Sequence, residues 1–266
     1  MKDELFKLVE SGQSIGQKKN IIREYLQLYI LRSLYNNNFF QYCAFHGGTC
    51  LRFVYDIKRF SEDLDFALVE DRRKFDFDKI IHKVKSELKD AGYSVGIKSK
   101  KKTVLSTLFR FSDLLYELNL SNRKEEYFSI KIEIDTEPPS KGTTQINIVN
   151  KYFMLGLKCY TLPTLYAGKI NAILTRSYIK GRDYYDLFWY LITYKEMLPD
   201  FNFLKNSLTQ FGWKGNFPDS STWKQKLTDV ILKAEWEIIR DDVELLLEDI
   251  NELKLFTKEN LLNLLT

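Results

Sequence analysis

The amino-acid sequence predicts an α+β fold, in which a mixed α/β half is followed by a helical half. In "YFSIKIEIDT" (127–136), three isoleucines alternate with charged residues, which is the two-residue period of a strand with one buried face. The segment "DFDKIIHKVKSELKDAGY" (76–93) has a helical period, with Asp at its start and Gly near its end. From Leu162 onward the pattern is mostly helical.

The other elements are predicted from the same two periods and from the turn residues that separate them. The segment "FHGGTCLRFVYD" indicates a short strand, a glycine turn and a helix. In chain order we expect a helix over 17–37, this strand–turn–helix over 45–56, a strand over 63–69, strands near 103–111 and 114–120, a loop over 137–145, a break over 211–225 and a C-terminal helical pair.

The composition is that of a globular protein. Hydrophobic residues make up 44% of the 266 residues, and no run approaches the ~18 apolar residues of a membrane-spanning helix. The N-terminal segment has no apolar core, so we expect no signal peptide. Three cysteines without CxxC spacing and only two histidines predict a reduced, cytoplasmic protein without a zinc site. The net charge of +4 permits a polyanionic partner but does not imply one.

Two carboxylates are predicted to lie side by side on one strand. In "DLDF", Asp63 and Asp65 are two positions apart, so both side chains point to the face opposite Leu64 and Phe66. Carboxylates held this close repel each other unless a proton or a cation intervenes. A hard divalent cation, Mg²⁺ above all, is the natural ligand, and the pair therefore predicts a metal site.

A third carboxylate joins this pair if the strand over 127–136 lies beside the strand over 63–69. Glu133 and Asp135 share one face of "KIEID" in the same way. Three acids can hold the two-metal arrangement used in phosphoryl and nucleotidyl transfer. The alternative is that Glu133 belongs to a solvated strand face.

The glycine turn predicts a phosphate site. Gly47 and Gly48 let backbone N–H groups approach a phosphate closely, and the N-terminus of the following helix favours negative charge. Thr49 adds a hydroxyl, and Ser61 either contacts phosphate or ends a turn. His46, beside the glycines, is interpreted as a hydrogen-bonded structural histidine.

Other acidic positions have structural interpretations. Asp76 and Asp78 repeat the Asp-x-Asp spacing, but they open a helix and are interpreted as capping residues. In the helical half, Gly181 is interpreted as a helix stop, after which Asp183 caps a new helix and Asp186 lies in its first turn. Lys169 opens an otherwise apolar helix, and a phosphate is a good candidate for its partner.

The ordered motifs "GGTCLRFVY", "RFSEDLDF", "KIEI" and "KINAILTRSYIKGRDYYDLFWYL" resemble the AbiEii/AbiGii toxin family, which includes the MenT toxins. The resemblance covers residues 40–195. It implies a polymerase-β-type nucleotidyltransferase core, a mixed sheet flanked by helices, followed by a C-terminal helical region. We expect the core, with its N-terminal helix, over 1–160, and a helical domain that completes the active site over 161–266.

The resemblance also implies an activity. Members are toxins of type IV toxin–antitoxin or phage-defence systems and are paired with an antitoxin protein. The MenT members transfer nucleotides from a nucleoside triphosphate (NTP) to the 3′ end of tRNA and so inhibit translation, with Mg²⁺ as the cofactor, possibly as two ions. Carried over to this sequence, the nucleotide-binding residues are Gly47, Gly48, Thr49, Ser61 and Lys169, and the metal-binding residues are Asp63, Asp65 and Glu133. The catalytic residues are these three acids with Lys169 and Asp186.

An RNA acceptor requires a basic surface. The candidates are Lys98, Lys100, Lys101, Lys102, Lys180 and Arg182, although "IKSKKKT" is equally typical of a solvated lysine-rich turn. Two alternatives stay open. The acceptor can be a protein or a small molecule, or the chain can be a non-catalytic NTP-binding partner subunit.

Overall fold

The computed structural model describes residues 2–266, which fold into two compact units. None of the helices formed by these residues combines the length and the hydropathy needed to cross a bilayer. We name the units the sheet unit (Met1–Tyr55, Phe60–Pro138 and Ile146–Cys159) and the helical unit (Asp56–Arg59, Pro139–Gln145 and Tyr160–Thr266).

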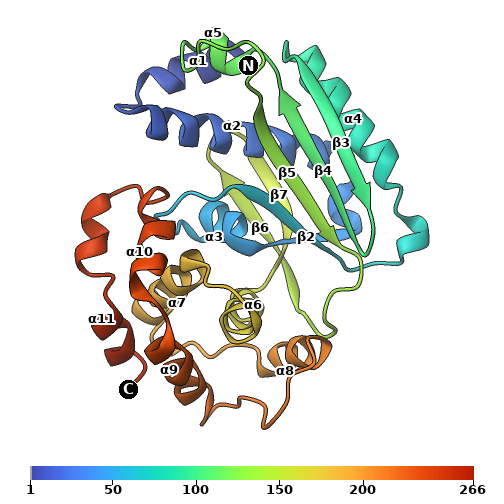
Figure 1. The fold of residues 1–266 in the computed structure, drawn as a ribbon. Coiled ribbons are helices and arrows are strands. Elements are labelled where there is room, and N and C mark those ends of the chain that lie inside the picture. Colours follow the sequence, from blue (N-terminus) through green and yellow to red (C-terminus); the bar gives the residue numbers. More distant parts are fainter. Residues whose placement is uncertain (1) are drawn as a thin grey trace. The chain divides into compact units, whose positions relative to one another are not determined.

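A seven-stranded mixed sheet with the strand order β3-β4-β5-β2-β1-β7-β6 forms the sheet unit (Figure 1). The strands β3, β4 and β5 are antiparallel neighbours, whereas β2 runs parallel to β5 and antiparallel to β1. The predicted α+β fold with a mixed sheet is confirmed. The strands are β1 (Cys43–His46), β2 (Asp63–Leu68), β3 (Val95–Lys101), β4 (Val104–Phe111), β5 (Phe128–Asp135), β6 (Thr144–Asn150) and β7 (Met154–Tyr160).

Helices of the sheet unit cover one face of the sheet. The helix α2 (Ile15–Asn36) contacts β5 and the helix α4 (Phe77–Asp90), which in turn contacts β3 (Figure 1). In α4, the side chain of Asp76 accepts a hydrogen bond of 3.0 Å from the amide of Lys79, which confirms the capping interpretation. The remaining helices are α1 (Lys2–Glu10), η1 (Phe39–Gln41), α3 (Gly47–Tyr55), η2 (Arg72–Lys74) and α5 (Leu114–Glu117).

Alternation along the strands gives the sheet two different faces. In β5, Ile130, Ile132 and Ile134 are fully buried, whereas the intervening residues are half-exposed. We call the half-exposed side the open face. By strand register it carries Asp63 and Asp65 of β2, Ser129, Lys131 and Glu133 of β5, Ser106, Leu108 and Arg110 of β4, and Lys98 and Lys100 of β3.

The helical unit contains α6 (Leu162–Thr175) and α7 (Gly181–Thr193), which pack against each other, and the helices that surround them. Its apolar core includes a stacked pair of rings from Tyr166 and Tyr190, whose centroids are 4.2 Å apart. The other helices are α8 (Phe201–Gln210), α9 (Trp223–Lys233), α10 (Trp236–Glu244), η3 (Ile250–Lys254) and α11 (Lys258–Asn263).

Two predicted elements are wrong and several strands escaped prediction. Residues 114–120 do not form a strand: Leu114–Glu117 form the short helix α5, preceded by Asp113 with a left-handed φ of 63°. Gly181 does not stop a helix but begins α7. A Cβ at this position would lie 2.1 Å from the carbonyl oxygen of Ile239, so only glycine fits this approach to α10. The strands β3, β6 and β7 were not predicted.

Candidate active site

The two strands that carry the acids, β2 and β5, lie side by side. β2 pairs with β5 in parallel, and in this register Asp65 is the partner of Glu133 and Asp63 is the partner of Lys131. All four side chains therefore lie on the open face, in two adjacent pairs. The expectation that "KIEID" brings a third carboxylate next to Asp63 and Asp65 depended on this pairing, and the pairing is confirmed.

The environment of Asp63 disfavours its negative charge. Burial and the neighbouring Asp65 raise the pKa of the Asp63 carboxyl to about 6, although Lys131 acts in the opposite direction. Glu133 also contributes to this increase. A bound divalent cation would favour the charged form of the Asp63 carboxyl and so offset the effects that raise its pKa.

Glu133 already has a cationic partner. The Nζ of Lys131 lies 2.7 Å from its Oε1, and Glu133 contributes to raising the pKa of Lys131, against the effect of burial. Within residues 2–266, no three acidic, histidine or cysteine side chains are grouped closely enough to form a preassembled metal centre. Asp63, Asp65 and Glu133 thus do not form a ready three-carboxylate site. The carboxylate oxygens of Asp63 and Asp65 do fit a hard cation such as Mg²⁺.

The glycine turn is built against these acids. Gly47 has a φ of +77°, and a Cβ on it would lie 2.5 Å from Oδ2 of Asp65. Glycine is therefore required twice, for its backbone conformation and for the space that Asp65 occupies. Gly47 and Gly48 are the first residues of α3, and the first amides of a helix have no intrahelical acceptor. These amides fit the predicted phosphate contacts.

The side chains of Thr49 and Gln27 hydrogen-bond to the backbone of residues 61–63, where the acidic segment begins. The hydroxyl of Thr49 is fully buried and donates to the backbone oxygen of Asp63, which favours a positioning role for this side chain. The side-chain amide of Gln27 donates to the carbonyl oxygens of Ser61 and Glu62 at 3.0 and 2.9 Å. His46 is half-buried and is the strand partner of Asp65.

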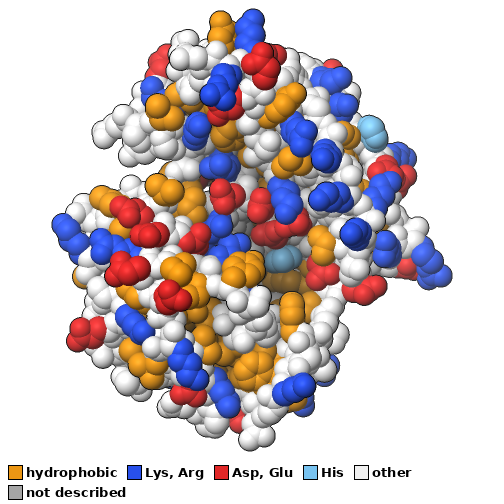
Figure 2. Space-filling view, in the orientation of Figure 1, with side chains coloured by type: hydrophobic (Ala, Val, Ile, Leu, Met, Phe, Trp, Pro, Cys, Tyr) orange, Lys and Arg blue, Asp and Glu red, His pale blue; other side chains and the backbone are white. Residues whose placement is uncertain are grey.

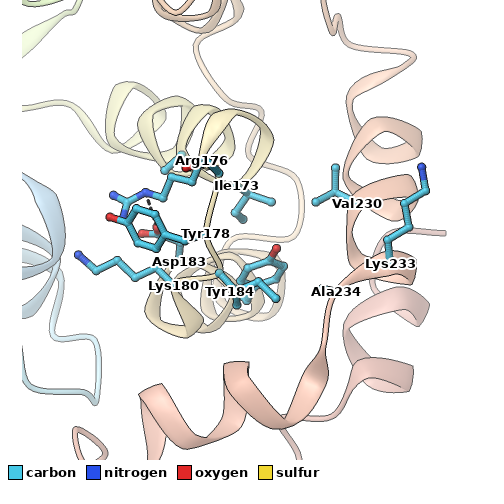
Figure 3. Close-up of a pocket in the computed structure, with 12 residues that line it drawn as sticks. Ile173, Arg176, Tyr178, Lys180, Asp183, Tyr184, Val230, Lys233 and Ala234 are labelled. Carbon is cyan, nitrogen blue, oxygen red and sulfur yellow. Dashed lines mark hydrogen bonds and ion pairs between the residues drawn. The ribbon is translucent and has the colours of Figure 1, made fainter.

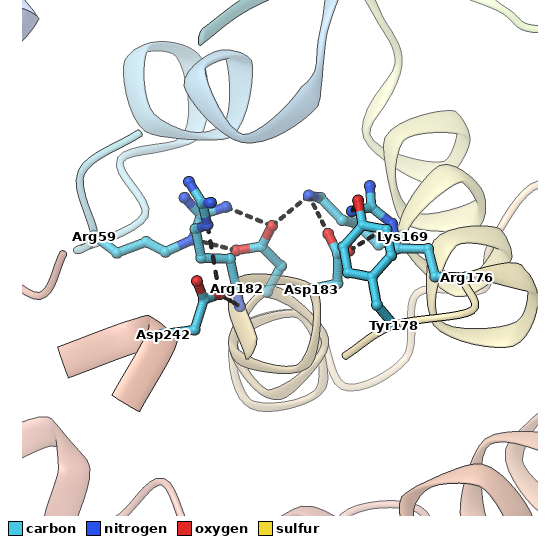
Figure 4. Close-up of polar contacts among 8 residues, drawn as sticks. Arg59, Lys169, Arg176, Tyr178, Arg182, Asp183 and Asp242 are labelled. Atoms are coloured by element: carbon cyan, nitrogen blue, oxygen red, sulfur yellow. Dashed lines mark hydrogen bonds and ion pairs between the residues drawn. The ribbon is translucent and has the colours of Figure 1, made fainter. Parts of the chain in front are cut away.

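A buried ionic cluster lies at the start of α7 in the helical unit (Figure 4). Arg59 donates two hydrogen bonds of 2.6 Å to Asp186. The ammonium of Lys169 lies 2.9 Å from Asp183 and 2.8 Å from Asp186, and Arg176 lies 3.3 Å from Asp183. Figure 4 shows Arg59 and Lys169 directed toward the α7 carboxylates from two sides. The cluster fixes the geometry of both acids.

This cluster corrects the interpretation of the two aspartates. Asp183 does not cap α7, because its side chain makes no capping hydrogen bond and instead pairs with Lys169. Burial raises the pKa of Asp183, but Lys169 and Arg176 outweigh it and hold the pKa below its ordinary value. Asp186 is fully buried between two cations rather than exposed to the helix N-terminus.

Beside this cluster, the helical unit contains a cavity (Figure 3). Arg176, Tyr178 and Lys180 lie on one side of it, and Val230 and Lys233 of α9 lie on the other. Burial and the neighbouring Arg182 lower the pKa of Lys180. Lys180, one of the predicted RNA-binding residues, therefore lines a cavity.

Comparison with known proteins decides the family. The model of the family described as "Nucleotidyl transferase AbiEii toxin, Type IV TA system" matches residues 29–258, most of the chain. The chain belongs to the AbiEii family. It is therefore a nucleotidyltransferase toxin of a type IV toxin–antitoxin system, which implies an NTP substrate, a divalent metal and an antitoxin partner.

Solved structures share the AbiEii fold. MenT4, a nucleotidyltransferase toxin from Mycobacterium tuberculosis H37Rv, superposes with a TM-score of 0.64 at 16% identity, covering 100% of this chain and 88% of that chain. JHP933 from Helicobacter pylori superposes with a TM-score of 0.53 at 21% identity, covering 92% of this chain and 90% of that chain. No curated protein sequence matches this AbiEii chain.

The lysine-rich segment of this AbiEii member is divided between the two sheet faces. Lys101 pairs with Asp78 of α4, and Ser99 bonds the buried Thr107 at 2.8 Å, so the odd-numbered residues of β3 point to the helix-covered face. Lys98 and Lys100 consequently point to the open face. Lys102, another of the predicted RNA-binding residues, follows the end of β3. The last of them, Arg182, lies in the helical unit, where its backbone amide donates a hydrogen bond of 3.0 Å to Asp242.

Two charged residues near the predicted site were not singled out from the sequence. Arg59 stands in the quoted string "RFSEDLDF", two positions before Ser61, and Lys131 stands in "KIEID", two positions before Glu133. Lys131 is two positions from Glu133 on the same strand, so the sequence alone could have placed both side chains on one face. No local sequence pattern around Arg59 predicts that its partner is Asp186.

Proposed function

We propose that this toxin transfers a nucleotide from an NTP to the 3′ end of tRNA, which prevents aminoacylation and inhibits translation. The observation that supports the chemistry is the strand register that sets Asp65 beside Glu133, with Asp63 two residues away on the same face. The acceptor rests on the resemblance to the MenT toxins. The basic residues on the open face agree with it.

In this proposal Asp63 and Asp65 hold the metal, and Glu133 is the third ligand or accepts the proton of the attacking hydroxyl. A divalent cation bound there supplies a clamp for the phosphates and stabilises the charge that develops on them. Lys131 balances Glu133 in the metal-free protein through the 2.7 Å ion pair. The amides of Gly47 and Gly48 and the hydroxyl of Ser61 contact phosphate oxygens, while Thr49 positions Asp63.

The transfer is one substitution at phosphorus. The oxygen of the terminal ribose hydroxyl forms a bond to the α-phosphorus, and the bond from that phosphorus to the bridging oxygen of the β-phosphate breaks. Pyrophosphate leaves with the electron pair of the broken bond, and the hydroxyl proton passes to a carboxylate or to water. Such a reaction depends on positioning and charge stabilisation, which is what rigid strands and a fixed helix N-terminus provide.

Lys169 is proposed to contact the triphosphate. A lysine ammonium has three N–H donors, and Asp183 and Asp186 are its two acidic neighbours, so one donor is available for a phosphate oxygen. Asp183 and Asp186 favour the charged form of Lys169, because their attraction outweighs burial and raises its pKa. Asp186 then acts by fixing Lys169 and Arg59.

The deciding experiment separates the possible acceptors. The purified protein is incubated with Mg²⁺, total tRNA and each NTP radiolabelled at the α-phosphate, with Asp63→Ala as the parallel control. We expect label on tRNA that is lost in the variant. Label on protein instead would replace tRNA by a protein acceptor, and NTP binding without any labelled product would overturn catalysis in favour of a binding subunit.

A further inference from the structure

The open face of the sheet carries charges of opposite sign on its two sides. Two rows of register partners cross it: Asp65, Glu133, Ser106 and Lys100 in one row, and Asp63, Lys131, Leu108 and Lys98 in the other. Both rows run from the carboxylates on β2 to lysines on β3. Figure 2 shows Lys and Arg side chains gathered over β3 and β4, with acidic side chains beside them.

The cations at the far end of these rows are available to a ligand. β3 is the edge strand of the sheet, and Lys98 and Lys100 are both exposed. In the part of the chain that the structure describes, neither lysine has an ion-pair or hydrogen-bond partner. The adjacent Lys101, by contrast, pairs with Asp78 on the helix-covered face.

An aromatic ring with a cation beside it lies on the same face. Tyr127 immediately precedes β5, and its position in the alternation places it with Ser129 and Lys131. Its side chain is 54% exposed, and the guanidinium of Arg110 lies 5.8 Å from its ring centroid. An exposed ring next to basic residues is the arrangement on which unpaired bases stack.

We propose that the open face binds the single-stranded 3′ end of the acceptor RNA, with its backbone on Lys98, Lys100 and Arg110 and a base on Tyr127. Three strand spacings of about 4.8 Å separate β3 from β2, so the lysines anchor the strand about 14 Å from the carboxylates. This proposal rests on the proposed function for the identity of the acceptor.

Charge and chemistry favour RNA over a protein partner on this face. It presents cations, serine hydroxyls and one aromatic ring, with Leu108 half-buried among them, rather than a continuous apolar patch. Phosphates complement the unpaired lysines, and the acidic side of the face repels the RNA backbone except where a metal compensates. With cations on β3 and carboxylates on β2, this distribution of charge favours an RNA that reaches β2 only with its 3′ end and not with the middle of its strand.

The test measures binding without catalysis. A fluorescently labelled single-stranded RNA ending in CCA is titrated with protein in the absence of NTP, at several salt concentrations. The double variant Lys98→Gln/Lys100→Gln is compared with Lys79→Gln/Lys83→Gln, which removes the same charge from exposed positions on α4. We expect weaker binding only in the open-face variant, with the slope of log K against log salt reduced by about 1.4 for two lost phosphate contacts.

The proposed stacking of a base on Tyr127 is tested against a control substitution at Tyr116. Tyr116 is 44% exposed and also contacts a cation, Lys124, but it lies on α5. Tyr127→Ala is expected to weaken RNA binding about fivefold or more without changing the salt slope, because base stacking is worth about 1–3 kcal/mol. Tyr116→Ala is expected to bind RNA like the wild type.

Equal losses in the open-face and α4 variants, or no loss in either, would overturn the proposal. Circular dichroism checks that each variant is folded. Nucleotide transfer by the wild-type protein, measured with the same RNA, distinguishes the two hypotheses. If RNA binds to the open face but no nucleotide is transferred to it, the proposed function fails and the binding surface stands; if transfer occurs and the open-face variants bind normally, only this inference fails.

Discussion

The guanidinium of Arg59 donates two hydrogen bonds of 2.6 Å to the carboxylate of Asp186, which is 127 residues away in the sequence. The side chains are 1% and 0% exposed. Lys169 lies 2.8 Å from the same carboxylate and provides a second cation. Asp186 is therefore the buried centre about which two basic side chains of the helical unit are arranged.

Loss of Asp186 is expected to affect stability as well as activity. Asp186→Ala removes the carboxylate to which the buried Arg59 donates two hydrogen bonds, and breaking a buried ion pair in this way costs about 3–5 kcal/mol. Chemical denaturation should show this decrease in the free energy of unfolding, whereas Asp63→Ala should show no decrease. An inactive Asp186→Ala protein of wild-type stability would show instead that Asp186 acts directly on substrate.

Asp63 is expected to be essential for transfer and dispensable for folding. It lies on the open face, where its neighbours disfavour its charge, so replacing it removes a proposed metal ligand without opening the core. Asp63→Ala should reduce kcat by orders of magnitude, and chelation of divalent ions should abolish wild-type activity until Mg²⁺ is restored. Near-normal turnover by Asp63→Ala would show that the chemistry lies elsewhere.

The raised pKa of Asp63 predicts a pH-dependent stability in the metal-free protein. Its folded-state pKa of about 6 exceeds the ordinary value of 3.8, so the folded protein binds more protons between these values. The free energy of unfolding therefore falls as pH rises through this window, and the penalty is complete above about pH 6. Asp63→Asn lacks this penalty.

Thermal unfolding without metal should place the Tm of Asp63→Asn above that of the wild type near neutral pH, with the difference vanishing below about pH 4. Adding Mg²⁺ near neutral pH should raise the Tm of the wild type and not that of the variant. A variant less stable than the metal-free wild type at neutral pH would contradict the electrostatic account.

Two glycines of the helical unit provide a matched test of packing. Gly181→Ala places a methyl group 2.1 Å from a backbone oxygen of α10 and should destabilise the protein. Gly168 lies within α6 with no atom within 4 Å of an added Cβ, so Gly168→Ala should stabilise by about 0.5–1 kcal/mol. Denaturation of both variants measures these opposite signs, and a destabilised Gly168→Ala would be the contrary result.

The part of the candidate site that follows from local pattern was predictable. The two-residue period placed Asp63 and Asp65 on one face of β2 and Glu133 on one face of β5, because burial of the alternating apolar residues enforces that period. Their meeting on one side of the sheet followed only from the pairing of β2 with β5. The helical pattern of 76–93 gave α4 and its cap. The activity was predicted from the family motifs, because hydrophobic periodicity indicates structure and not chemistry.

What escaped prediction depends on distant partners. Val95 is the one buried residue of the edge strand β3, so "VGIKSKK" has almost no apolar alternation from which a strand can be predicted. Asp186 was predicted in a first helical turn, but Arg59 and Lys169 decide its role, and only the tertiary fold unites them. The division of the lysine segment between two faces likewise required the pairing of Ser99 with Thr107.

The space in front of Gly47 has a consequence for mutational studies of the glycine motif. A methyl group there would collide with the Asp65 carboxylate before any nucleotide arrives. An inactive Gly47→Ala protein would therefore be ambiguous evidence for phosphate recognition, because the substitution also alters a proposed metal ligand. Gly48 has a φ outside the left-handed region, so a substitution there avoids the backbone strain expected at Gly47.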